Sequence, residues 1–111
     1  MKWIPLTSNE QLESIKQKSI TTPQVVFKHS TRCSISSMVL NRLERETAPE
    51  NVDFYFLDLI QYRQLSNAVA EIFDVQHESP QILLIKNALC VYDESHQGVN
   101  MQELTEQISA N

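Results

Sequence analysis

Glycine is almost absent from this chain, since Gly98 is the single glycine among 111 residues. A glycine-rich loop that cradles phosphate needs several glycines close together, so the sequence excludes nucleotide-binding loops of that kind. Long hydrophobic runs are absent too, because no apolar stretch approaches the roughly 18 residues of a membrane span. Residues 1–5 lead straight into polar sequence and do not resemble a signal peptide. We therefore expect a cytoplasmic protein.

The charges form no run of one sign. The chain carries nine Lys and Arg against 14 Asp and Glu, a formal net charge of -5, and the basic residues are scattered. This pattern argues against nucleic acid and anionic membranes as partners. A hydrophobic fraction of 41% is ordinary for a globular protein, and the length suits one domain over residues 1–111.

Cysteine is scarce as well. Cys33 and Cys90 fall in different predicted elements, and a cytosolic chain of this size does not normally carry a structural disulfide. The histidines, His29, His77 and His96, are isolated, and no C-x-x-C motif is present. The spacing therefore predicts no metal site.

What the sequence does contain is the periodicity of an α/β fold, in the order β-α-β-α-β-α-β-β-α. Apolar runs predict strands over 24–29 and 52–59, joined by a helix from Cys33 to about Thr47 as a right-handed crossover. The other predicted elements are an edge strand at 3–6, a helix from the capping pair Ser8 and Gln11 to about Lys18, a helix over 62–73, a hairpin of 81–86 with 89–92, and a final helix after Asn100. Helical spacing places these residues inward: Leu12, Ile15, Ile35, Met38, Val39, Leu43, Tyr62, Leu65, Val69, Ile72, Phe73, Met101, Leu104 and Ile108.

Cys33 is predicted to lie where a strand gives way to a helix. The first N–H groups of a helix lack intrahelical partners, and the helix dipole places partial positive charge there. Such a position, beside a cation such as Arg32, favours a thiolate over a thiol. The alternative is that Cys33 is a small, buried and inert cysteine, and that Arg32 is a solvated surface charge.

The cysteine begins a C-x-x-S motif, Cys33 to Ser36. A hydroxyl can donate a hydrogen bond to a thiolate but cannot form a disulfide with it. If Cys33 is catalytic, an outside thiol or a distant cysteine must resolve its mixed disulfides. Cys90 lies in the predicted last strand, and we interpret it as a packing residue rather than the resolving thiol.

The element order, the cysteine at the start of the second helix and the Ser79-Pro80 step before the fourth strand resemble the thioredoxin fold. The resemblance implies a central mixed sheet of about five strands with flanking helices. It also implies that Pro80 is cis and lies against Cys33, and that the backbone of Ser79 pairs with an extended substrate.

Four separated patches are similar to the monothiol bacilliredoxin family of the bacillithiol system. They are 27–33, 35–36, 65–67 and 77–81. The resemblance implies a cytoplasmic thiol-disulfide exchange protein that acts on mixed disulfides between bacillithiol, a low-molecular-weight thiol, and client proteins. Bacillithiol would be a co-substrate, and no tightly bound cofactor is implied.

Our leading hypothesis for the mechanism assigns roles to residues. Cys33 would be the nucleophile, Arg32 would stabilise its anion, and Ser36 would hydrogen-bond it. Thr31, Ser79 and Pro80 would contact the substrate.

Two positions depart from the family pattern. Ser34 stands where the family usually has proline, which is preorganised for the first helical turn, so thiol reactivity could differ. Ala88 stands where the family's hairpin turn favours glycine after asparagine, which bears on stability.

Other functions remain compatible with the sequence. A thioredoxin-like module could bind a partner and use Cys33 only as an oxidation sensor, without turnover. A monothiol glutaredoxin could use one cysteine and an external thiol to ligate an iron-sulfur cluster. His29 could transfer a proton at the site or could be a hydrogen-bonded structural histidine.

Overall fold

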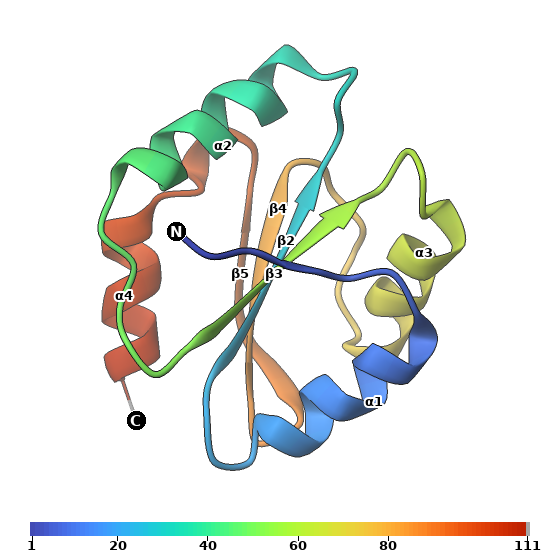
Figure 1. The fold of residues 1–111 in the computed structure, drawn as a ribbon, viewed down its shortest axis with the longest axis vertical. Helices are drawn as coiled ribbons and strands as arrows, with labels where there is room; N and C mark the ends of the chain where they lie inside the picture. The colour runs from blue at the N-terminus through green and yellow to red at the C-terminus, as the bar shows by residue number, and fades with distance from the viewer. Residues whose placement is uncertain (111) are drawn as a thin grey trace.

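The structure is a computed structural model that describes residues 1–110. The predicted element order is confirmed, with one short 3-10 helix added before the last helix. The elements are β1 (Ile4–Pro5), α1 (Asn9–Lys18), β2 (Gln24–His29), α2 (Ser34–Arg45), β3 (Asp53–Asp58), α3 (Arg63–Ile72), β4 (Gln81–Lys86), β5 (Leu89–Ser95), η1 (His96–Gly98) and α4 (Met101–Ser109) (Figure 1).

The strands form one five-stranded mixed sheet in the order β1-β3-β2-β4-β5. The first three are mutually parallel, whereas β4 runs antiparallel to β2 and forms a hairpin with β5. β2 lies in the middle and all six of its residues are buried. The predicted α/β class, with parallel strands first and a hairpin last, is confirmed.

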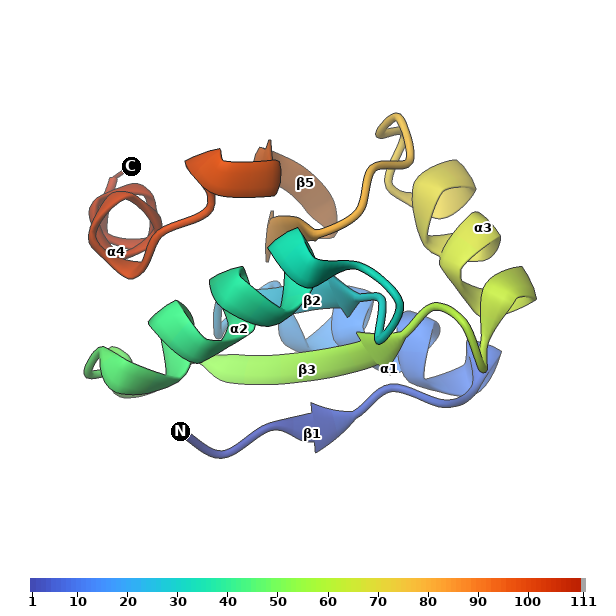
Figure 2. The ribbon, with the colours of Figure 1, turned by 90° about the horizontal axis from the view of Figure 1, so that it is seen from above.

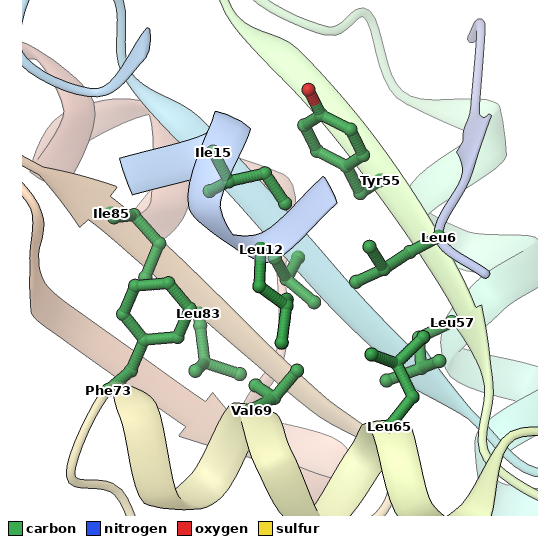
Figure 3. Packing of buried hydrophobic residues seen from close by; sticks show 11 residues of the cluster. Leu6, Leu12, Ile15, Tyr55, Leu57, Leu65, Val69, Phe73, Leu83 and Ile85 are labelled. Atoms are coloured by element: carbon green, nitrogen blue, oxygen red, sulfur yellow. The ribbon is translucent and has the colours of Figure 1, made fainter. Parts of the chain in front are cut away.

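Helices cover both faces of the sheet (Figures 1 and 2). α1 and α3 pack on one face around a first hydrophobic cluster, and α2 and α4 pack on the other around a second. Figure 3 shows how the first cluster meets the sheet, with Leu12 and Ile15 of α1 and Val69 of α3 pointing toward it.

Two residues expected to face inward are exposed instead: Met38 is 46% exposed and Ile72 is 44% exposed. The buried stripe of α2 runs through Val39 and Leu43, so Met38 lies beside it, about 100° around the helix. Ile72 is the last residue of α3, and Phe73 fills the core after it. The periodicity was right, but the stripe is narrower than the spacing suggested.

The polar residues predicted to begin helices do so. The side chain of Gln11 accepts the backbone N–H of Ser8 at 3.1 Å, and Asn100 Oδ1 accepts the N–H of Glu103 at 2.8 Å. These bonds satisfy donors that have no partner inside the helix. No helix within residues 1–110 is long and apolar enough to cross a membrane.

The turn between β4 and β5 uses the left-handed backbone region twice. Asn87 has φ 54° and Ala88 has φ 67°. Two such residues make the turn type that matches the twist of a hairpin, although alanine is a poor choice for it. Ser19 steadies the turn, because its carbonyl accepts the N–H of Asn87 at 2.9 Å and its hydroxyl accepts that of Ala88 at 2.8 Å.

Candidate active site

Cys33 caps the N-terminus of α2, as predicted. Its backbone is extended, with φ -112° and ψ 116°, and its N–H donates to the carbonyl of Ser30 at 3.2 Å across a tight turn. Its carbonyl accepts the N–H of Ser37 at 3.1 Å, which begins the helix. The side chain is half-buried, and the first turn of α2 has no acidic residue. The positive end of the helix dipole therefore lies at Cys33, and no carboxylate in the first turn opposes it.

Ser36 is fully buried, and its hydroxyl lies between two groups of the preceding strand and turn. Its Oγ is 2.7 Å from His29 Nδ1 and accepts the N–H of Ser30 at 3.1 Å. Among the described residues, the structure contains no hydrogen bond between Ser36 and the sulfur of Cys33. Ser36 thus ties α2 to the end of β2.

His29 is 5% exposed and stacks with Phe27 on the α2 side of the sheet. Burial lowers the pKa of His29, and the negative charges of Asp58 and Glu44 oppose this shift. The ring is therefore neutral at pH 7, with one nitrogen that donates and one that accepts. Whether Nδ1, the nitrogen that faces Ser36, carries the ring proton decides where the hydroxyl proton of Ser36 points.

Ser79 and Pro80 lie beside the turn that carries Cys33. Lys28 of β2 pairs with Gln81 of β4, so the next residue of β2, His29, lies opposite Pro80. The Ser79-Pro80 peptide bond is cis, as the resemblance implied. β2 ends and β4 begins at the same end of the sheet (Figure 1). The topology thus brings together two parts of the site that are far apart in the sequence.

The backbone of η1 adds a third segment to this end of the sheet. The N–H of His96 donates to the carbonyl of Pro80 at 2.9 Å. Its ring is 3.7 Å from a carboxylate oxygen of Glu78, and both side chains are exposed. This contact could not be predicted from sequence pattern, because His96 follows a strand in a segment without periodicity.

Thr31 and Arg32 form the exposed tip of the turn before Cys33. The N–H of Arg32 donates to the hydroxyl of Ser30 at 3.3 Å, which helps to shape the turn. Within residues 1–110, the guanidinium of Arg32 has no salt bridge to a carboxylate. Both side chains are therefore free to meet a ligand.

Sequence reasoning assigned no role to Lys28, which is fully buried near this end of the sheet. Its Nζ is 3.2 Å from the carbonyl of Ser66 and 3.2 Å from His77 Nδ1. A lysine inside an apolar strand was the available signal, because lysine is rarely buried.

Cys90 lies on the edge strand β5 and packs against the first hydrophobic cluster. Burial raises the pKa of Cys90 to about 11, so this thiol is protonated at neutral pH. A cavity of about 520 Å³ lies elsewhere, between the N-termini of α1 and α3, and none of the predicted site residues lines it.

Comparison with known proteins gives a family and a fold. The family model of the monothiol bacilliredoxin BrxC matches residues 4–104. A solved structure described as a putative oxidoreductase with a thioredoxin fold is 30% identical, covers 96% of this chain and 93% of its own, and superposes with a TM-score of 0.82.

More distant thioredoxins share the fold. A Malassezia sympodialis thioredoxin is 17% identical, with 97% of this chain and 89% of that chain covered and a TM-score of 0.74. Spinach chloroplast thioredoxin f is 16% identical, with coverages of 96% and 90% and a TM-score of 0.72. The architecture is the thioredoxin fold, and family and fold together support a thiol-redox function. Because the family match spans nearly the whole chain, the protein belongs to the monothiol bacilliredoxin family.

Proposed function

We propose that this protein removes bacillithiol from mixed disulfides on cytoplasmic client proteins, with Cys33 as the single nucleophile. The observation that carries the proposal is the position of Cys33 at the start of α2, with a hydroxyl three residues later where a second thiol would close a disulfide. Such a site accepts a small thiol but cannot expel it with a neighbouring cysteine. It suits transfer of that thiol rather than formation of a protein disulfide.

The reaction consists of two successive thiol-disulfide exchanges. The Cys33 thiolate attacks the bacillithiol sulfur, a new disulfide forms between them, and the client leaves as a thiolate that takes up a proton from water. A free bacillithiol thiolate then attacks the bacillithiol sulfur on Cys33, which yields bacillithiol disulfide and restores the Cys33 thiolate. A partner reductase could perform the second step instead.

Two side chains and the helix would stabilise the nucleophile. The dipole of α2 and the guanidinium of Arg32 favour negative charge on the sulfur of Cys33. Ser36 makes no hydrogen bond to Cys33 in the described structure, so it would stabilise the thiolate only if the Cys33 side chain moved toward it and the ring of His29 kept its own proton on Nδ1, which leaves the hydroxyl proton free. The tautomer of His29 would therefore control the hydrogen bond that Ser36 offers.

The incoming disulfide would lie at this end of the sheet, between the turn that carries Thr31 and the segment that carries Ser79 and Pro80. Thr31 is exposed in the turn before the nucleophile and would contact the small thiol. The backbone of Ser79, beside Pro80, would pair with the client chain and align its disulfide with Cys33. The hydroxyl of Ser79 is buried and has no hydrogen-bond partner within residues 1–110. The proposed pairing with the client therefore uses the backbone of Ser79 and not its side chain.

The test is release of bacillithiol from a bacillithiolated client by the wild type, by Cys33→Ala and by Cys90→Ser. We expect the wild type and Cys90→Ser to free the client and to carry bacillithiol on Cys33, detected by intact mass. Cys33→Ala should do neither. Mixed disulfides of glutathione and coenzyme A serve as control substrates, and we expect slower release from both.

Other results would point to other functions. If no mixed disulfide were reduced, the fold would serve binding or oxidation sensing, and the enzymatic proposal would be wrong. A brown protein with visible absorbance after anaerobic reconstitution would support a bound iron-sulfur cluster instead.

A further inference from the structure

Lys28 carries an ammonium group in the interior of the protein. Its side chain is 0% exposed, and within residues 1–110 no carboxylate forms a salt bridge with it. An ammonium buried without a counter-ion is costly, and burial lowers the pKa of Lys28 to about 8. The group is still mainly charged at neutral pH, so its two hydrogen bonds must offset a large desolvation cost.

One of those bonds reaches the segment that precedes Ser79. Lys28 Nζ lies 3.2 Å from Nδ1 of His77, whose own side chain is exposed. Burial lowers the pKa of His77, the charges of Lys28 and Arg63 lower it further, and Glu78 opposes them. A neutral His77 can therefore accept a hydrogen bond from the ammonium through Nδ1 at pH 7.

The cross-strand neighbour of Lys28 holds the same segment. Gln81 pairs directly with Lys28, and directly paired residues present their side chains on one face of the sheet. Gln81 is also fully buried. Its Nε2 donates to the carbonyl of Gln76 at 2.9 Å, and its Oε1 accepts the N–H of Glu78 at 3.4 Å.

Two buried side chains thus hold three consecutive residues, 76–78, from beneath. These residues belong to neither a helix nor a strand, so they lack the backbone ladder that would otherwise fix their position. Ser79 follows them directly.

We propose that Lys28 and Gln81 are positioning residues, which hold 76–78 so that the backbone of Ser79 meets the mixed disulfide in register with Cys33. This inference rests on the proposed function. It implies that removal of the Lys28 bond harms recognition of a client protein but not the intrinsic reactivity of Cys33, since a small alkylating reagent needs no backbone pairing.

The experiment compares Lys28→Met with the wild type, with Lys86→Met as the matched control. Lys86 lies at the far end of β4 and bonds to the carbonyls of Ile108 and Ala110. We expect Lys28→Met to raise KM for a bacillithiolated client about tenfold, the fold-change of losing one hydrogen bond to a charged group, with kcat within about twofold. The rate of Cys33 alkylation by iodoacetamide should not change, and Lys86→Met should match the wild type in both assays.

His77→Ala removes the same contact without altering the core, so it covers the case in which Lys28→Met fails to fold. The double variant should be no worse than Lys28→Met, because each change removes the same Lys28–His77 bond. Unchanged KM in the folded variants would overturn the proposal. So would an equal fall in alkylation rate, because Lys28 would then act on the thiol itself.

Hydrogen exchange separates this inference from the proposed function. In Lys28→Met and His77→Ala, the amides of 76–79 should exchange faster, while those of β5 should exchange as in the wild type. If the wild type releases no bacillithiol, the proposed function fails, and this measurement still tests the positioning alone. Equal exchange at 76–79 in all variants would overturn the positioning role.

Discussion

Lys28 and His29 are consecutive in β2, and their side chains leave it on opposite faces of the sheet. Lys28 reaches α3 and the segment before Ser79, whereas His29 reaches Ser36 of α2. The last two residues of one central strand therefore support both halves of the site. Each is a buried titratable group, so each links the site to pH.

The lowered pKa of Lys28 predicts that the free energy of unfolding depends on pH. Its pKa falls from 10.5 to about 8 on folding, so between these values the unfolded chain binds more protons than the folded one. The free energy of unfolding contributed by Lys28 must therefore rise with pH across this window and be lost as pH falls through about 8. Relative to Lys28→Met, the wild type should gain about 1.6 kcal/mol between pH 8 and pH 9.5, measured by urea unfolding. Parallel pH profiles of the two proteins would contradict the lowered pKa.

Ser36 predicts a stability effect that does not depend on catalysis. Ser36→Ala leaves the N–H of Ser30 and Nδ1 of His29 without their partner in a buried place. We expect a loss of about 1–3 kcal/mol in the free energy of unfolding, the usual consequence of an unsatisfied buried group. Ser37→Ala is the matched control, since Ser37 is the next residue of α2 and is exposed. Equal losses in both variants would mean that the buried hydroxyl adds no stability.

At the scale of elements, the start of α2 is ready for the proline that the family usually has after its cysteine. Ser34 is the first helical residue, where proline fits because its missing N–H would lack a partner anyway. Cys33, with φ -112° and ψ 116°, is close to the extended backbone that a residue before proline requires. We expect Ser34→Pro to stabilise the protein by about 0.4–1 kcal/mol relative to Ser34→Ala, measured by thermal unfolding. Destabilisation would show that the turn at 30–33 has no room for the ring.

The β4–β5 hairpin offers a second stabilising change. Ala88 has φ 67°, a conformation that an alanine adopts at a cost and a glycine adopts freely. Ala88→Gly should therefore raise the free energy of unfolding by about 1 kcal/mol. Asn87→Gly is the comparison, and a smaller gain is expected there because asparagine tolerates positive φ. If the two variants gained equally, the strain would not be specific to Ala88.

Local pattern predicted most of the elements and the place of Cys33 at the start of α2. The bounds of β2 and β4 agree with the structure, because both are apolar runs bounded by polar residues. The contacts of Lys28 and Gln81 could not be predicted in this way. They depend on the register of β2 against β4 and on a segment without periodicity that returns over the sheet. The end of β5 was placed three residues too early for a related reason, since its last residues are polar and pair with β4 on an edge.

At the scale of the whole molecule, the sheet separates the two cysteines. Cys90 pairs with Ile85, which pairs with Gln24 at the start of β2, whereas Cys33 follows the end of that strand. The six residues of β2 span roughly 17 Å at about 3.3 Å per residue. Cysteines can be bridged only when their Cα atoms lie within about 7 Å, so a bond between these two would require the sheet to break.

This separation predicts the products of oxidation. Treated with an excess of bacillithiol disulfide at pH 7, the protein should gain the mass of one bacillithiol on Cys33 and none on Cys90, whose pKa of about 11 keeps it a thiol. Intact and peptide mass spectrometry of the wild type and of Cys90→Ser should give the same single adduct. A species two hydrogens lighter than the reduced protein, present in the wild type and absent from Cys90→Ser, would reveal an intramolecular disulfide. Cys90 would then be a resolving thiol, and regeneration of Cys33 would not require a second small thiol.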